Sequence, residues 1–65
     1  MSLNRDEATT LRTAAAAVAA AIWHHVTLSN ADDVVFFANN PTPLPPGTLV
    51  VVGRADGQFD VFWLE

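Results

Sequence analysis

The first third of the chain has apolar positions that recur every three to four residues. This spacing aligns side chains along one side of an α-helix. The aligned stripe consists of Leu11, Ala15, Val18 and Ile22. Asn4 is a favourable N-cap residue, and Glu7 follows it by three positions, as a capping box requires. The pattern therefore predicts one helix over about residues 5–25.

The same helix carries a second strip of small side chains, formed by Ala14, Ala17 and Ala21. A helix on the surface of a monomer ordinarily shows a polar face, yet no Asp, Glu, Lys or Arg occurs between Arg12 and Asp32. The alternative is a solvent-exposed strip that only reflects high helix propensity. We expect instead that another helix or a sheet packs closely against the strip.

Three later segments have the β-branched and aromatic composition of strands, at residues 33–38, 49–55 and 58–64. Residues 39–48 between the first two hold all four prolines and are predicted to form a stiff, partly extended loop. The elements together predict a small single α+β domain over residues 1–65. Its architecture is one N-terminal helix packed on a three-stranded antiparallel sheet, in the order αβββ.

The last two predicted strands flank Asp56-Gly57, a pair typical of two-residue hairpin turns. A two-residue turn places Val52 opposite Val61 and Val51 opposite Phe62. Both sheet faces are then largely apolar, whereas an antiparallel sheet with one wet face alternates between apolar and polar positions. One helix covers only one face, so the sequence predicts that the other face is an interface. The alternative is that the strands curl into a partial barrel, which buries part of the second face inside the protomer.

The candidate interface combines the alanine strip with large apolar residues of the sheet. Its predicted members are Ala14, Ala17, Ala21, Phe36, Phe37, Val51, Phe62 and Trp63. A second candidate contact lies in the proline-rich loop, where Pro43, Leu44 and Pro45 belong to a PxxP match. This match lacks a flanking Lys or Arg, so a rigid loop that only connects two strands is the alternative.

Composition strengthens the expectation of assembly. The chain has 65 residues, of which 51% are hydrophobic, and it has no cysteine. Domains of about 60 residues bury little surface and are usually stabilised by disulfides, metals or oligomerisation. Disulfides are excluded by composition, which favours a homodimer or higher oligomer. The low charge content and the aromatics also argue against an intrinsically disordered tail.

Charge and hydropathy exclude several classes of partner. The net charge is −4 and the three basic residues are scattered arginines, which form no basic stripe for nucleic acid or anionic lipid. The alanine-rich apolar run of about ten residues is shorter than the roughly 20 that a membrane span needs. Acidic residues before this run argue against a secretory signal. We therefore expect a cytoplasmic protein that binds neither nucleic acid nor membrane.

Residue types that could carry chemistry occur in poor patterns. His24 and His25 with Asp32 and Asp33 contain metal-ligand types, but adjacent helical residues point about 100° apart and chelate one ion poorly. Ser29 completes the residue types of a hydrolase triad, but no nucleophile-elbow motif surrounds it. We predict no metal, no cofactor and no catalytic site.

The sequence thus predicts a non-catalytic, homo-oligomeric interaction module. Small regulators, inhibitors and immunity-type proteins that bind another protein are its expected class, and mild acidity favours a basic partner surface. The alternative is a carrier that holds a small apolar ligand in a pocket between protomers. An enzyme with its site at a subunit interface ranks third, and only the histidines and aspartates named above could serve it.

Overall fold

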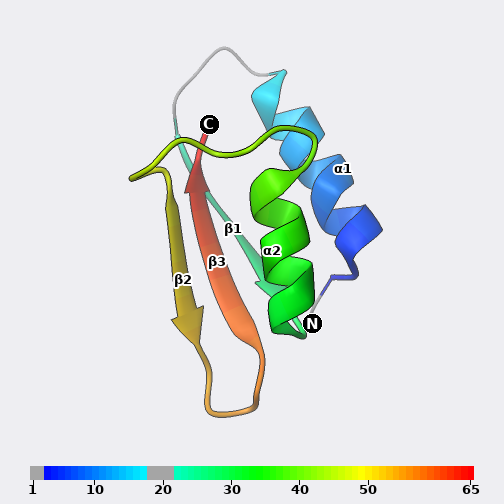
Figure 1. Ribbon diagram of the computed structural model, residues 1–65, viewed down its shortest axis with the longest axis vertical. Coiled ribbons are helices and arrows are strands. Elements are labelled where there is room, and N and C mark those ends of the chain that lie inside the picture. The colour runs from blue at the N-terminus through cyan, green and yellow to red at the C-terminus, as the bar shows by residue number, and fades with distance from the viewer. Residues whose placement is uncertain (1–2, 18–21) are drawn as a thin grey trace.

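The computed structural model describes residues 3–17 and 22–65. Two helices and three strands follow one another along the chain (Figure 1): α1 (Arg5–Ala16), β1 (Trp23–Leu28), α2 (Ala31–Asn39), β2 (Leu49–Gly53) and β3 (Phe59–Leu64). The strands form one antiparallel sheet in the order β1-β3-β2. The predicted α+β class, with an N-terminal helix and a three-stranded antiparallel sheet, is confirmed, and a second short helix is added.

The N-terminal helix begins as predicted and ends earlier. The Asn4 side chain accepts a hydrogen bond from the Glu7 backbone, and the Glu7 side chain accepts one from Asn4, so the capping box is present. α1 ends at Ala16, and the predicted continuation to residue 25 is wrong because Trp23–Leu28 is a strand. Its aromatic and β-branched side chains suit a pleated strand better than a helix.

The predicted strand at residues 33–38 is wrong, because this segment lies in α2. The Asn30 side chain caps the helix by accepting a hydrogen bond from the Asp33 backbone at 2.8 Å. Asp32 and Asp33 lie in the first turn, where carboxylates interact favourably with the helix dipole. These interactions, with burial of Phe37, override the strand propensity of the Val-Val-Phe-Phe run.

The side of α1 that faces the core differs from the predicted stripe. Ala8, Arg12 and Ala15 are buried, whereas Leu11 is exposed. The Arg12 guanidinium is buried because it donates hydrogen bonds to the backbone oxygens of Phe37 and Asn40 and to the Glu65 carboxylate. A buried charge is tolerated where it is paired in this way.

The hairpin between β2 and β3 is shifted by one residue from the predicted register. Arg54 donates a backbone hydrogen bond to Gln58 across a three-residue loop, and Gly57 in this loop has φ +83°. A three-residue loop with a left-handed glycine is the next most common hairpin after the two-residue turn. Val51 consequently pairs with Val61, not with Phe62, and the strands end at Gly53 and begin at Phe59.

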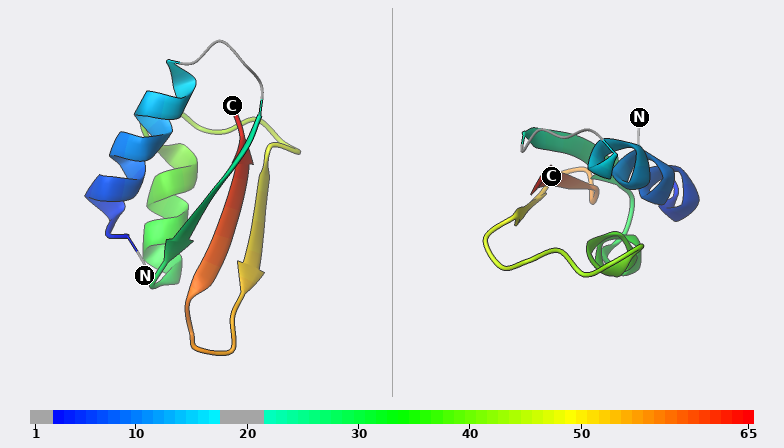
Figure 2. Two further views of the ribbon diagram at one scale, coloured as in Figure 1. Left: turned by 180° about the vertical axis from the view of Figure 1, so that it is seen from behind. Right: turned by 90° about the horizontal axis from the view of Figure 1, so that it is seen from above.

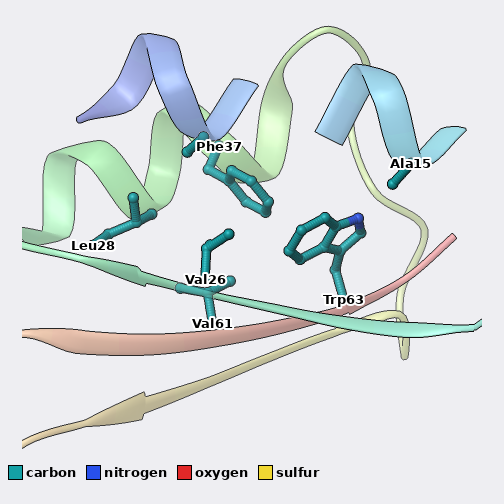
Figure 3. Close-up of a cluster of buried hydrophobic side chains, with 7 residues drawn as sticks. Ala15, Val26, Leu28, Phe37, Val61 and Trp63 are labelled. Atoms are coloured by element: carbon teal, nitrogen blue, oxygen red, sulfur yellow. The ribbon is translucent and has the colours of Figure 1, made fainter. Parts of the chain in front are cut away.

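The core lies between the sheet and the two helices, which both sit on one side of it, nearer to β1 and β3 than to β2 (Figure 2). Figure 3 shows Val26, Val61 and Trp63 rising from the strands towards Phe37 of α2. The buried apolar cluster consists of Ala8, Ala15, Val26, Leu28, Phe37, Val61 and Trp63. This arrangement leaves the opposite sheet face without a covering element among the described residues.

Candidate interaction surface

The sheet face turned away from the helices is called here the outer face. Successive strand residues point to opposite faces, so the neighbours of buried Val26, Val61 and Trp63 point outwards. The register aligns these outward residues in rows across the three strands. The outer face comprises Trp23, His25, Thr27, Val50, Val52, Asp60, Phe62 and Leu64.

Large apolar side chains dominate one part of the outer face. The exposed fractions are 53% for Trp23, 47% for Val50, 48% for Val52 and 36% for Phe62. Val50, Phe62 and His25 form one row across the sheet. The His25 ring stacks on Phe62 with 4.8 Å between ring centroids, so the two rings lie against each other within this row. Aromatic and aliphatic side chains presented together in this way are typical anchors of protein interfaces.

A polar cluster adjoins this apolar area and converges on Asp60. Its Oδ1 atom lies 3.1 Å from Nε2 of His25, 3.1 Å from Oγ1 of Thr27 and 3.4 Å from Nη1 of Arg54. The hydrogen bond with His25 lowers the pKa of Asp60 below its usual value. Desolvation opposes this shift, and the Thr27 hydroxyl and the Arg54 charge add to the lowering. The cluster therefore holds a carboxylate in its ionised form on an otherwise apolar face.

Two predicted interface residues are core residues in the structure, which corrects their assignment. Phe37 is fully buried and Trp63 nearly so, and their rings meet edge to face at 4.8 Å. Both side chains are turned towards the protein interior, so neither is presented to a partner (Figure 3). Phe37 is inward because its segment is a helix, and Trp63 is inward because it lies on the same face of β3 as the buried Val61.

The other predicted interface residues that the structure describes lie on separate parts of the molecule and form no common surface. Phe36 is half-buried under the Arg5 guanidinium, which lies 4.7 Å from the ring centroid, and is therefore already covered within the protomer. Ala14 and Ala17 are exposed on α1, and Ala21 lies outside the described residues. Val51 is exposed on the same sheet face as Val61, whereas Phe62 is on the outer face.

The predicted partner loop is only partly available for contact. Pro43 and Pro45 are exposed. Leu44 between them is half-buried against the core cluster, and its backbone N–H donates to the Ala38 carbonyl at 2.9 Å. Leu44 therefore fixes the loop to the core, and only Pro43 and Pro45 of the predicted contact are exposed to a partner.

Sequence reasoning missed Trp23, Val50 and Val52 as members of the exposed surface. The predicted helix over residues 5–25 includes Trp23, and the predicted pairing of Val52 with Val61 puts both valines on the face of Trp63. The available signal was Asp56-Gly57 itself, because Gly57 also fits the left-handed position of a three-residue loop. With that loop, the alternation along the strands assigns both valines to the face of Phe62.

The residue types considered for metal or catalytic chemistry lie apart from one another. His24 stacks on Trp63, and His25 joins the Asp60 cluster on the outer face. Asp33 pairs with Arg5 at 3.0 Å on α2. Within residues 3–17 and 22–65, no three acidic, histidine or cysteine side chains form a group that could hold a metal ion. The described part of the chain also contains no pocket.

No helix among the described residues is long and apolar enough to cross a membrane. The chain matches no protein-family model, no curated protein and no solved structure in the three comparisons made.

Proposed function

We propose that the protein is a non-catalytic, self-associating interaction module, of the kind represented by small regulators, inhibitors and immunity-type proteins. The observation that carries this proposal is the exposed apolar surface of the sheet, formed by Trp23, Val50, Val52 and Phe62 on the outer face and by Val51 of β2. Both helices are on the other side of the sheet (Figure 2). An exposed apolar area bordered by polar side chains is typical of a protein-binding surface.

The polar cluster supports a role in recognition. Asp60 is ionised next to the apolar row, and the chain as a whole has a net charge of −4. A partner with an apolar patch and an adjoining basic group would complement both features. Pro43 and Pro45 provide a second exposed contact in the loop that leads into β2.

The test compares a lysine substitution on the outer face with a lysine substitution on α2, on the other side of the sheet. Phe62→Lys places a charge in the centre of the outer face, whereas Val35→Lys places one on α2, where Val35 is already exposed. Both variants, with an affinity tag, are used to capture proteins from cells of the native source after chemical cross-linking.

We expect the wild type and Val35→Lys to recover the same cross-linked partner, and Phe62→Lys to lose it while its circular dichroism spectrum is unchanged. Equal recovery by Phe62→Lys and Val35→Lys contradicts a role of the outer face in partner binding. No observation in the described residues supports the carrier or the enzyme hypothesis.

A further inference from the structure

Within residues 3–17 and 22–65, no segment pairs with the outer edge of β2, and the composition of this edge strand is unusual. β2 reads Leu-Val-Val-Val-Gly and contains no charged residue and no proline. Natural edge strands are usually protected by lysines, prolines, bulges or a covering segment. The opposite edge has such a segment, because Leu3 donates its N–H to the Thr27 carbonyl at 2.9 Å beside β1. Figure 1 shows β2 as the outermost strand on its side of the molecule.

The hydrogen bonds of the hairpin determine which backbone groups point to the open edge. Leu64 donates to Thr48 at 2.9 Å, and Arg54 donates to Gln58 at 2.8 Å. Bonded residues alternate along an antiparallel strand, so even-numbered residues of β2 are directed to β3. The N–H and C=O groups of Leu49, Val51 and Gly53 are therefore directed away from the sheet.

The side chains of β2 are exposed on both sheet faces. Val50 and Val52 are exposed on the outer face, and Val51 is 41% exposed on the inner face. A second molecule stacked on one sheet face covers either Val50 and Val52 or Val51, but not all three valines. A strand added along the edge reaches both groups and also pairs the outward backbone, so edge pairing accounts for more of the exposed surface than face stacking does.

We propose that β2 pairs with β2 of a second copy of this chain, antiparallel and centred on Val51, and so forms a six-stranded sheet across the dimer. This proposal rests on the proposed self-association and specifies its surface. In this register Leu49 lies opposite Gly53 of the second copy, and Val50 lies opposite its Val52. All outward backbone groups of β2 are then paired, which gives about six hydrogen bonds across the two-fold axis.

Charge and side-chain chemistry suit a second copy as the occupant. The cross-strand pairs next to the axis are all Val–Val, and pairs of β-branched residues are favourable. Residues 47–53 carry no charge, so Arg54 of each copy lies beside the neutral Thr48 of the other and no like charges meet. The two-fold axis is perpendicular to the sheet, so both outer faces remain on one side and form one larger surface.

Introduced cysteines test the register, because the chain has no thiol of its own. Residue 51 of one copy lies about 5.5 Å from residue 51 of the other in a hydrogen-bonded pair, which a disulfide can span. Residue 50 lies about 8 Å from residue 50 of the other copy, which is beyond disulfide reach. We expect Val51→Cys to form a covalent dimer under mild oxidation at least tenfold faster than Val50→Cys. Equal rates, or faster cross-linking of Val50→Cys, overturn the register.

A second experiment separates edge pairing from face stacking by light scattering. Val51→Pro removes an N–H group that β3 does not use, and proline is tolerated in an edge strand at such a position. We expect Val51→Pro to be monomeric with an unchanged circular dichroism spectrum, and Phe62→Lys on the central strand to remain dimeric.

The reverse pattern, a dimeric Val51→Pro and a monomeric Phe62→Lys, assigns the dimer to the outer face. That result overturns edge pairing and leaves the proposed self-association intact. A monomeric wild type overturns both proposals. If Val51→Pro does not fold, the two cysteine variants decide the register without it.

Discussion

Arg12 connects three separate parts of the chain at the level of a single residue. Its Nε atom donates to Glu65 Oε1 at 3.0 Å, and its Nη1 atom donates to the carbonyls of Phe37 at 2.9 Å and Asn40 at 2.6 Å. The side chain is 3% exposed, so these partners cannot be replaced by water. The hydrogen bonds join α1 to the end of α2 and to the residue that follows β3.

Replacement of Arg12 should therefore be among the most destabilising single changes. We expect Arg12→Leu to lower the free energy of unfolding by about 3–5 kcal/mol, because it leaves buried carbonyls and a carboxylate without their partner. Urea denaturation followed by circular dichroism measures the loss. Arg54→Leu is the matched control, since Arg54 is exposed and its ion pairs contribute about 1 kcal/mol or less. Equal stability of the two variants would refute the structural role of Arg12.

The lowered pKa of Asp60 makes part of the stability dependent on pH. A carboxylate with a depressed pKa in the folded state contributes stability above its unfolded pKa, and the contribution is lost as the pH falls through the folded value. For Asp60 this loss occurs below pH 3.8, the ordinary value of its carboxyl group. We expect wild type to be more stable than Asp60→Asn at neutral pH and the difference in Tm to shrink in strongly acidic buffer. A difference that does not change with pH would contradict the assigned cause.

At the scale of elements, the hairpin loop decides which side chains reach the outer face. Gly57 has φ +83°, and no atom other than those of Gly57 and its two chain neighbours lies within 4 Å of the position a Cβ would occupy. An alanine at position 57 would therefore meet no steric clash with other residues, and its only cost would be the unfavourable left-handed backbone conformation. Gly53 is equally open, and its φ is not in the left-handed region.

The two glycines form a matched pair for testing the loop. We expect Gly57→Ala to cost about 1–2 kcal/mol of stability, because alanine disfavours the left-handed conformation. Gly53→Ala should be neutral or stabilise by up to about 1 kcal/mol through the unfolded chain. Thermal unfolding of both variants and of the wild type measures these changes in stability. A larger loss for Gly53→Ala than for Gly57→Ala would indicate a different loop.

Local sequence signals, namely a helix cap and runs of apolar residues, predicted three of the elements correctly. The Asn4–Glu7 capping box located the start of α1, and the apolar runs located β2 and β3. The start of α2 was missed because residues 33–38 have the composition of a strand. The Asn30 side chain acts as the N-cap of this segment. Here packing of Phe37 decides the structure, and packing is not a local property of the sequence.

The exposed surface was predicted in outline and only partly in its residues. Phe62 and Val51 are exposed as expected, but they lie on opposite faces, and Phe37 and Trp63 are buried. A shift of one residue in a hairpin moves every side chain of a strand to the other face relative to its partner. The excess of apolar residues can therefore be read from composition, whereas their distribution depends on the loop conformation.

At the scale of the whole molecule, the chain folds with a surface ordinary for its size. It exposes 3976 Å² for a mass of 7.0 kDa, against about 10,000 Å² for an unfolded chain of this mass. About 60% of the surface is thus buried, as is usual for small and marginally stable domains. What is unusual is the composition of the exposed part, with three consecutive valines on the open edge of the sheet. Association would both cover them and add stability that depends on protein concentration.

Sedimentation equilibrium of the wild-type protein over a wide range of concentration tests self-association most directly. We expect the weight-average mass to rise from 7.0 kDa towards at least twice that value as concentration increases, and the temperature of unfolding to rise with it. A mass of 7.0 kDa at every concentration, with a constant unfolding temperature, would contradict the proposed self-association.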